Sequence, residues 1–299
     1  MKILISGSSG FIGSALVSFL TEKRAEVVRL VRSQPKSGEE AVLWNPDDGK
    51  IDVSRLKGCD AVVHLASENI IGRWTAGKKA KIRDSRVKGT QLLSGALAKL
   101  DQRPKVLVCA SAVGYYGDRG EETLEEGAPP GSGFLAKVCQ EWEKAAEPAK
   151  QAGIRVVNLR IGMVLSPSGG ALKMMLPPFK MGLGGILGGG KQYTSWISLD
   201  DLLAAFQHAI ATETLRGPVN AVAPNPVTNR DFTKTLGRVL KRPTLFPMPS
   251  PVVKLIFGEM GQEIFLAGQR VIPSKLIDTG FPFHHLELES ALRGLLGKT

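Results

Sequence analysis

A glycine-rich turn at the N-terminus constrains the fold of this chain more than any other feature. The apolar segment Lys2–Ser6 is typical of a strand, and it leads directly into GSSGFIG, after which helical spacing of apolar residues begins. Glycine at such positions permits a tight turn, close approach of the backbone to a pyrophosphate, and close packing of a helix on a sheet. The start of the helix then presents free N–H groups to an anion. We therefore predict a dinucleotide-binding turn whose candidate contacts are Gly7, Ser9, Gly10, Phe11, Ile12 and Gly13.

The first 165 residues alternate short apolar runs with helical stretches. The further predicted strands are Val27–Val31, Ala61–Leu65, Val106–Ala110 and Arg155–Arg160, and the predicted helices are Gly13–Lys23, Lys78–Lys99 and Leu135–Gln151. Several of these strands are apolar along almost their whole length, which is typical of a parallel sheet buried on both faces. Alternation of strand and helix with right-handed crossovers predicts an α/β fold with a doubly wound parallel sheet of the Rossmann type.

The later part of the chain has a different composition. Met181–Gly190 (MGLGGILGGG) is too rich in glycine for a helix or a strand, and it predicts a loop placed like a lid. Prolines cluster from Pro243 onward, and two short helices are expected around Pro273. We therefore expect a nucleotide-binding domain at residues 1–242, with its Rossmann core mainly in residues 1–165, and a small, mainly helical C-terminal cap at residues 243–299.

The end of the second predicted strand indicates which dinucleotide binds. Val31 ends that strand and Arg32 follows it, within a segment, RLVRSQPK, that contains no acidic residue. A site for NAD needs Asp or Glu near this point to bind the ribose hydroxyls, whereas arginine suits the 2′-phosphate of NADP. We predict NADP as the cofactor, and the alternative is that Arg32 is an ordinary surface residue.

Composition excludes several other classes of protein. The net charge is +11, but the charge is spread along the chain, with one denser patch at residues 78–88, and no aromatic cluster or nucleic-acid-binding motif accompanies it. That patch is either a solvated helix face or a surface that faces the dinucleotide.

Cys59, Cys109 and Cys139 are far apart, and the histidines lack ligand spacing, so we expect neither disulfides nor a metal site. Without a signal peptide or an apolar run long enough to span a bilayer, we expect a cytoplasmic protein whose partner is a small-molecule substrate rather than nucleic acid or membrane. An oligomer or protein partner is possible but not indicated.

Motifs along nearly the whole chain resemble one family. They are GSSGFIG, HLASENI, GRWTAGKKAKIRDSRVKGT, SAVGYYG, LRIGMVLSPSGGAL and SWISLDDL, together with the tail from Pro249. In these the chain resembles the epimerase family proteins of the extended short-chain dehydrogenases that carry a small C-terminal domain of unknown function. The resemblance implies a C-terminal half that caps a substrate cleft. It also implies cofactor contacts at Val31, Arg32, Leu65, Ala66, Arg86 and Val164.

The chain departs from this superfamily at the catalytic motif. Short-chain dehydrogenases use a Tyr-x-x-x-Lys pair, in which the lysine lowers the pKa of the tyrosine so that it can transfer a proton. Here Lys137 matches the lysine, but Gly133 stands where the tyrosine belongs. Ser111 matches the serine that polarises the substrate, and Tyr116 lies just beyond it. We therefore take Ser111, Tyr116 and Lys137 as the candidate catalytic residues.

Two functions remain open at this point. One is an NADP-dependent oxidoreductase or epimerase that acts on an unidentified carbonyl, hydroxyl or nucleotide-sugar substrate. The other is a regulatory protein that senses NADP with little or no turnover, since relatives of the family have been connected with cell or organelle division. The missing tyrosine favours the regulator, while the glycine turn suits both functions.

Trp196 and Asp201 are expected to hold the junction between the two halves of the chain. His64 is expected to be a core residue whose hydrogen bonds are satisfied.

Overall fold

The computed structural model describes residues 1–34 and 40–298. Pro35 and Lys36, at the end of the RLVRSQPK segment, therefore lie outside the described residues. The largest element is an eight-stranded sheet with the order β12-β8-β6-β5-β1-β2-β3-β4, in which every neighbouring pair is parallel except β3 and β4. Its strands are β1 (Lys2–Ser6), β2 (Glu26–Val31), β3 (Ala41–Asn45), β4 (Lys50–Ile51), β5 (Ala61–His64), β6 (Val106–Ala112), β8 (Arg155–Ile161) and β12 (Gly217–Ala221).

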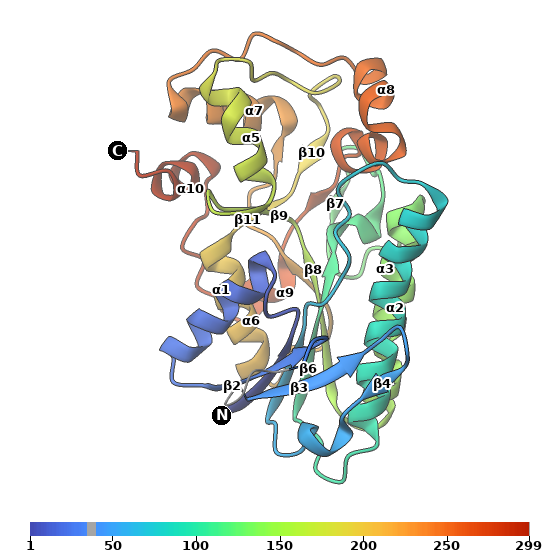
Figure 1. Ribbon diagram of the computed structural model, residues 1–299. Helices are drawn as coiled ribbons and strands as arrows, with labels where there is room; N and C mark the ends of the chain where they lie inside the picture. Colours follow the sequence, from blue (N-terminus) through green and yellow to red (C-terminus); the bar gives the residue numbers. More distant parts are fainter. Residues whose placement is uncertain (35–39, 299) are drawn as a thin grey trace.

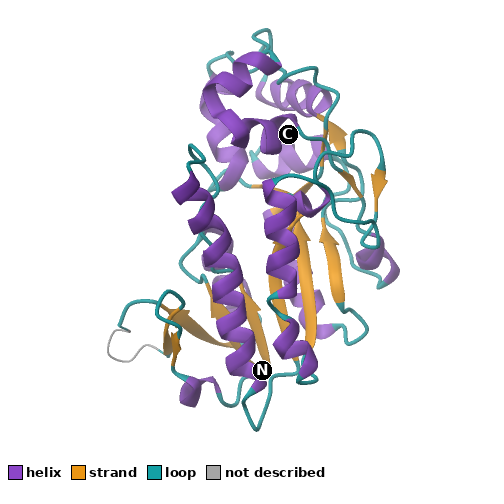
Figure 2. Cartoon of the chain, turned by 90° about the vertical axis from the view of Figure 1, so that its right-hand side faces the viewer, coloured by secondary structure: helices purple, strands orange, loops and turns teal. Residues whose placement is uncertain are grey.

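Helices cover both faces of the sheet (Figures 1 and 2). On one face lie α1 (Phe11–Glu22) and α6 (Leu199–Ala211), and on the other lie α2 (Ala76–Ala98), α3 (Phe134–Lys144) and α4 (Glu147–Gln151). Separate buried apolar clusters fill the two interfaces, one containing residues of α1 and α6 and the other residues of α2 and α4. From the central strand β1 the chain runs outward to one edge and later to the other. The predicted doubly wound parallel sheet is thus confirmed.

The prediction of one helix over Leu135–Gln151 is wrong. The structure has two helices, α3 and α4, separated at Ala145 and Ala146. Pro148 is the physical reason, because it has no N–H to donate to the preceding turn and its ring excludes the carbonyl four residues earlier. In the structure Pro148 occupies the first turn of α4, where a missing N–H costs little.

A second lobe lies above the carboxyl edge of the sheet (Figure 1). Its elements are β9 (Met163–Leu165), α5 (Gly170–Lys180), β10 (Tyr193–Thr194), β11 (Trp196–Ser198), β13 (Val227–Thr228), α7 (Asn229–Leu240) and α10 (Leu288–Leu295). A buried cluster that includes Leu172, Trp196, Phe232 and Leu292 holds α5, α7 and α10 together. The segment 181–190 contains no helix or strand, as predicted, and isolated backbone bridges from Leu183 and Leu187 join it to residues 244 and 248.

The C-terminal segment is mainly helical, as expected, and it contacts several parts of the molecule. Its elements are α8 (Ser250–Met260), the π-helical turn η3 (Gly261–Leu266), β14 (Arg270–Val271), α9 (Ser274–Asp278) and α10. β14 pairs with β7 (Thr123–Leu124), and α9 packs beside β12. Asp201 accepts hydrogen bonds from the backbone N–H groups of His284 (2.8 Å) and His285 (3.1 Å), so it joins α6 to the C-terminal segment.

Candidate functional site

The glycine turn lies between β1 and β5, where the strand order reverses. Gly7 has a φ of +69°, a left-handed conformation that favours glycine, and a Cβ there would come within 2.8 Å of the backbone of Leu65 and Ala66. A Cβ on Gly13 would come within 2.1 Å of the Gly7 carbonyl oxygen. Only glycine therefore allows the turn, the first helix and the end of β5 to approach so closely. Ligands of open α/β sheets bind in the crevice at such a switch point.

The start of α1 has free hydrogen-bond donors. Gly10 is the N-cap residue and supplies no side-chain cap, and among the described residues the N–H groups of Phe11, Ile12 and Gly13 have no partner. These donors, with the positive end of the helix dipole, form a site suited to a phosphate. The Phe11 ring packs against Gly169 and Gly170 at the start of α5, so the turn also contacts the upper lobe.

A surface cavity of about 400 Å³ lies next to this turn but outside the crevice. Its lining residues are Ser9, Gly10, Phe11, Ser14, Ala15, Ser18, Ser168 and Leu199. Because neither Leu65 nor Arg86 lines it, this cavity is the outer side of α1 rather than the dinucleotide crevice. Val164, in β9, is half-buried, and its carbonyl oxygen would lie 3.4 Å from a Cβ on Gly170.

Ser6 and His64 support the opposite wall of the crevice. The Ser6 hydroxyl oxygen accepts the backbone N–H groups of Leu65 (3.1 Å) and Ala66 (3.3 Å) and lies 2.6 Å from Nδ1 of His64. The His64 ring is fully buried against Trp44, and burial lowers its pKa to about 4. His64 is thus a neutral core residue, as expected, but it is not fully satisfied, because its Nε2 has no hydrogen-bond partner among the described residues.

The end of the crevice at which the sequence predicts the adenosine contains more charged side chains than Arg32 alone. Val31 is the last residue of β2, and Arg32 is exposed beyond it. The Lys78 ammonium lies 2.6 Å from the Glu68 carboxylate, and this hydrogen bond lowers the pKa of Glu68. The positive charges of Lys81 and Arg32 act in the same direction, so Arg32 lies within electrostatic range of Glu68 and of the basic start of α2.

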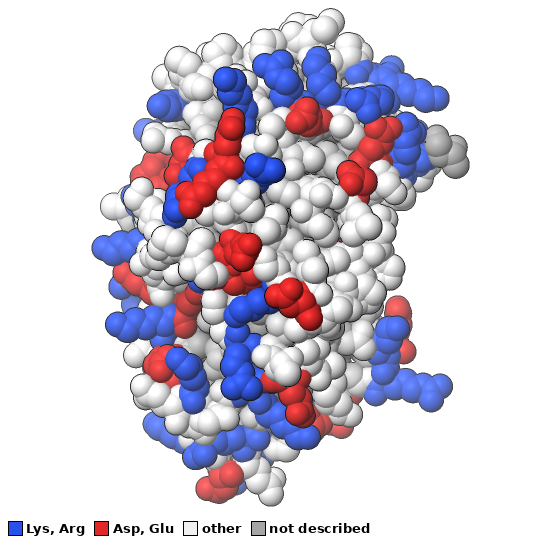
Figure 3. Space-filling view, turned by 180° about the vertical axis from the view of Figure 1, so that it is seen from behind, with Lys and Arg blue, Asp and Glu red and all other residues white. Residues whose placement is uncertain are grey.

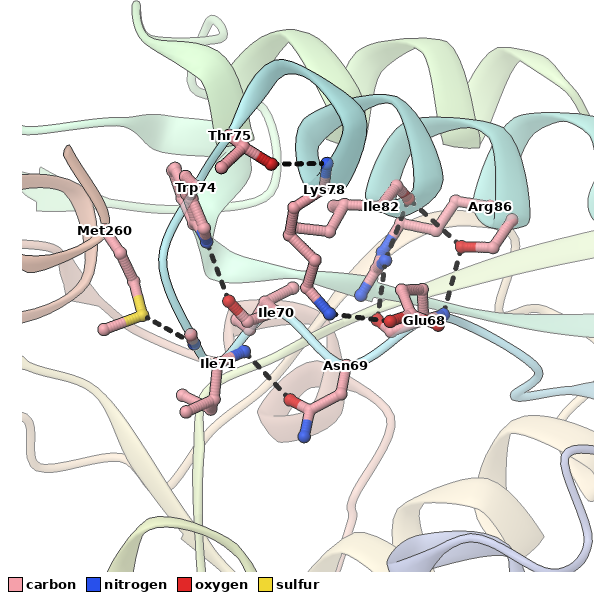
Figure 4. Close-up of polar contacts among 12 residues, drawn as sticks. Glu68, Asn69, Ile70, Ile71, Trp74, Thr75, Lys78, Ile82, Arg86 and Met260 are labelled. Atoms are coloured by element: carbon pink, nitrogen blue, oxygen red, sulfur yellow. Dashed lines mark hydrogen bonds and ion pairs between the residues drawn. The ribbon is translucent and has the colours of Figure 1, made fainter. Parts of the chain in front are cut away.

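Arg86 holds the loop that follows β5 (Figure 4). Its Nη1 donates to the backbone carbonyls of Glu68 (3.0 Å) and Ile82 (2.9 Å), and its guanidinium lies 5.0 Å from the centre of the Trp142 ring. Burial lowers the pKa of Arg86. Nη1 of Arg86 thus forms hydrogen bonds within the chain, whereas Nε and Nη2 form none with any described residue.

The GRWT motif joins this loop to the C-terminal segment (Figure 4). The indole N–H of Trp74 donates to the carbonyl of Ile70 (2.8 Å), and its ring packs edge-on against Phe134. Thr75 caps the N-terminus of α2, and the N–H of Gly72 contacts the sulfur of Met260 at 3.3 Å. The motif therefore shapes the rim of the crevice.

Ser111 and Tyr116 belong to one buried polar network. The Ser111 hydroxyl donates to Oε1 of Glu143 (2.7 Å), and the Glu143 carboxylate accepts two N–H groups of Arg160, at 2.8 and 2.9 Å. Arg160 also donates to the Tyr116 hydroxyl (2.9 Å), which in turn donates to Asn220 (2.7 Å). Tyr116 is fully buried, and burial raises its pKa. Tyr116 is therefore enclosed by protein, and Ser111, at the carboxyl end of β6, is only 3% exposed.

Lys137 is not part of that network. It lies on the exposed face of α3 and forms no hydrogen bond or ion pair through its side chain with any residue in the described ranges. One turn earlier, Gly133 has a φ of +105°, and a Cβ there would come within 3.0 Å of the Glu263 carboxylate. That carboxylate accepts the backbone N–H groups of Phe134 (2.7 Å) and Leu135 (2.8 Å). Glu263, from η3, thus caps α3 next to the position of the missing tyrosine.

Sequence reasoning overlooked five residues of the site, namely Glu68, Lys78, Glu143, Arg160 and Glu263. Glu68, Lys78 and Arg160 had a local signal, because they lie in motifs already singled out. The others become neighbours of the site through contacts between distant segments. No group of acidic, histidine or cysteine side chains suited to a metal occurs in the described part of the chain. The structure describes no helix there that is long and apolar enough to cross a bilayer.

Comparison with known proteins identifies the family. The family model of the NAD dependent epimerase/dehydratase family matches residues 3–221. The chain belongs to this family. A second model, a domain of unknown function (DUF1731), matches residues 248–295.

Two relatives match along almost their whole length, and a third matches over part of its length. An epimerase family protein of Mycobacterium bovis is 48% identical over 97% of this chain and 96% of its own. The crystal structure of human epimerase family protein SDR39U1 (isoform 2) with NADPH superposes with a TM-score of 0.90 at 35% identity, covering all of both chains. A nucleoside-diphosphate sugar epimerase of Corynebacterium glutamicum gives a TM-score of 0.81 at 36% identity, covering 99% of this chain and 58% of that one.

Proposed function

We propose that this protein binds NADP(H) and acts as an oxidoreductase or epimerase on a small carbonyl, hydroxyl or nucleotide-sugar substrate. The glycine turn carries the proposal. A Cβ at Gly7 or Gly13 would collide with neighbouring backbone, so only glycine permits this close turn, and the uncapped first turn of α1 follows it directly. The human relative crystallised with NADPH supports the choice of dinucleotide.

Charge at the adenosine end supports NADP over NAD. Arg32 is exposed at the end of β2, and no acidic residue follows it in the described residues up to Gln34. The Glu68 carboxylate is already paired with the Lys78 ammonium, which balances its negative charge. A phosphate near Arg32 would therefore meet a positive field rather than a free carboxylate.

The chain's own residues have limited roles in the proposed reaction. When bound, the nicotinamide supplies hydride transfer. The Ser111 hydroxyl donates its hydrogen bond to Glu143, so its oxygen lone pairs are available to accept a hydrogen bond from a substrate hydroxyl. Lys137, one turn into α3, is the exposed cation available to hold or donate a proton.

A specific observation also favours the second candidate, an NADP-sensing regulator with little turnover. Gly133 lies where a tyrosine would serve, and Tyr116 is enclosed by Arg160 and Asn220. An assay of NADPH oxidation with a panel of carbonyl compounds and nucleotide sugars separates the two candidates. For an enzyme, Lys137→Met should lower turnover by about 10²–10⁴-fold, while the exposed Lys144→Met on the same helix should not. Absence of turnover with bound NADPH would favour the regulator.

The cofactor is tested by calorimetric titration of NADPH and NADH. We expect the wild type to prefer NADPH and Arg32→Ala to lose about tenfold to a hundredfold in affinity for it, because an arginine–phosphate contact is worth about 1.5–3 kcal/mol. Affinity for NADH should not change. Arg216→Ala, at an exposed position on another loop, is the matched control. Equal affinity of the wild type for the two dinucleotides would contradict the assignment of Arg32.

A further inference from the structure

Two long stretches of the chain contain no acidic residue. There is no Asp or Glu from residue 148 to residue 199, nor from residue 232 to residue 258. In the upper lobe α5 and α7 lie on one side and α8 on the other, and loops run between them across the top (Figure 1). The bridge from Leu183 to Thr244, and the Gly188 N–H donated to the Met248 carbonyl (2.9 Å), join the 181–190 loop, which follows α5, to residues 244–248, which precede α8. The acid-free stretches therefore form one continuous surface from α5 to α8.

This surface, which we call the lobe tip, is basic. Its exposed cations are Lys173, Lys180, Lys241, Arg242 and Lys254. None of them forms an ion pair with any residue that the structure describes. Figure 3 shows Lys and Arg side chains in a row along the upper edge of the molecule. The nearest acidic groups along the chain are engaged elsewhere: Glu259 pairs with Lys79, and Asp231 accepts the hydroxyl of Thr228.

The lobe tip is also apolar. Of the thirteen large apolar side chains that are exposed among the described residues, eight lie in it: Met174, Met181, Leu183, Leu245, Phe246, Val252, Leu255 and Ile256. Leu255 is 86% exposed and Leu245 is 71% exposed, so these two side chains extend into solvent. A concentration of this kind marks an interaction site.

The charge selects the kind of partner. A second copy meeting the first through a two-fold axis would place the same cations opposite one another, which opposes self-association. Nucleic acid would satisfy the lysines but not the aliphatic side chains. An anionic lipid surface satisfies both, because Leu, Phe, Met and Ile enter the headgroup boundary while lysines contact the phosphates. We propose that the lobe tip docks this protein peripherally on an anionic membrane surface.

This proposal is independent of the cofactor proposal. It replaces our expectation that the protein has no membrane partner. That expectation rested only on the lack of a signal peptide and of an apolar run long enough to span a bilayer. A peripheral site needs neither, since separate loops and one helix face supply it.

Co-sedimentation of the full chain with lipid vesicles tests the proposal. We expect binding to vesicles that contain phosphatidylglycerol and little binding to pure phosphatidylcholine. Lys180→Glu combined with Lys254→Glu should weaken binding roughly 25-fold or more, since each cation near an anionic surface is worth about fivefold. The control is Lys57→Glu with Lys99→Glu, which changes the net charge equally at exposed positions outside the lobe tip. Circular dichroism checks that each variant is folded.

A second pair of variants tests the apolar part. Phe246→Ser with Leu255→Ser should weaken binding at least about tenfold, whereas Ile277→Ser with Leu286→Ser, at comparably exposed positions elsewhere, should not. In Phe246→Trp, the new indole should shift its emission to the blue when anionic vesicles are added. Failure of the wild type to bind anionic vesicles, equal loss in either control pair, or a dimer that Phe246→Ser with Leu255→Ser dissociates would each overturn the proposal.

Discussion

The pH dependence of stability should report the buried imidazole of His64. In the folded protein its pKa is about 4, against an ordinary value of 6.5, and burial is the cause. Since the folded state binds the proton less readily than the unfolded chain, the contribution of His64 to stability is fully present above about pH 6.5. It is lost as the pH falls from there toward about pH 4.

The size of the effect follows from the two pKa values. The full difference, 6.5 against about 4, corresponds to roughly 3 kcal/mol. Between about pH 8 and about pH 5 most of it is lost, which is about 2 kcal/mol. Urea unfolding at the two pH values measures this loss. The variant His64→Asn, which retains a polar partner for Ser6, should be less stable at neutral pH but should lose about 2 kcal/mol less between the two conditions.

Other titrating groups serve as controls for this reasoning. Burial also lowers the pKa of His208, but that ring is hydrogen-bonded to Thr279 and is less buried, so His208→Asn should remove a smaller part of the pH dependence. If His64→Asn loses as much stability between the two pH values as the wild type, the buried imidazole is not the group that titrates, and the argument fails.

Two further predictions concern the contacts around α3. Arg160→Met should destabilise the protein by about 3–5 kcal/mol in urea unfolding, because it leaves the Glu143 carboxylate buried without its partner. The double variant Arg160→Met with Glu143→Leu should recover much of that loss, and no recovery would contradict this cause. Glu263→Gln should cost about 1–3 kcal/mol, since the amide cannot accept both backbone N–H groups, and limited proteolysis within residues 261–266 should become faster. Unchanged proteolysis would show that Glu263 does not hold η3.

Local patterns were sufficient for the parts of the fold that are repeated and apolar. The strand predictions agree with β1, β2, β5, β6 and β8 to within a few residues at each end, because each is a short β-branched run between polar segments. The edge strands β12 and β4, and β3 beside β4, were not predicted. Asn220 and Gly217 interrupt the apolar pattern of β12, and its place in the sheet depends on pairing with β8.

The residues of the candidate site also fall into two groups, those that the local sequence indicates and those that only tertiary contacts bring together. The glycine turn could be located in the sequence because its glycines lie within seven residues directly after an apolar strand, although Gly7 also lies against the backbone of Leu65 and Ala66. Glu263 could not be located, because it lies 129 residues from the N–H group of Phe134 that it accepts. Arg160 is similar: nothing around it in β8 indicates that it pairs with Glu143 on α3.

By itself, the sequence determined the five parallel strands β1, β2, β5, β6 and β8, the dinucleotide turn and the absence of acid in RLVRSQPK, since these depend on backbone conformation and on residue type at neighbouring positions. The tertiary structure alone decided which distant groups meet. It enclosed Tyr116 and bonded Ser111 to Glu143, placed Glu263 against α3, and joined two acid-free stretches into the lobe tip. The physical reason is that periodicity records which side of an element faces the core, whereas burial, ion pairing and surface continuity depend on what packs against that side.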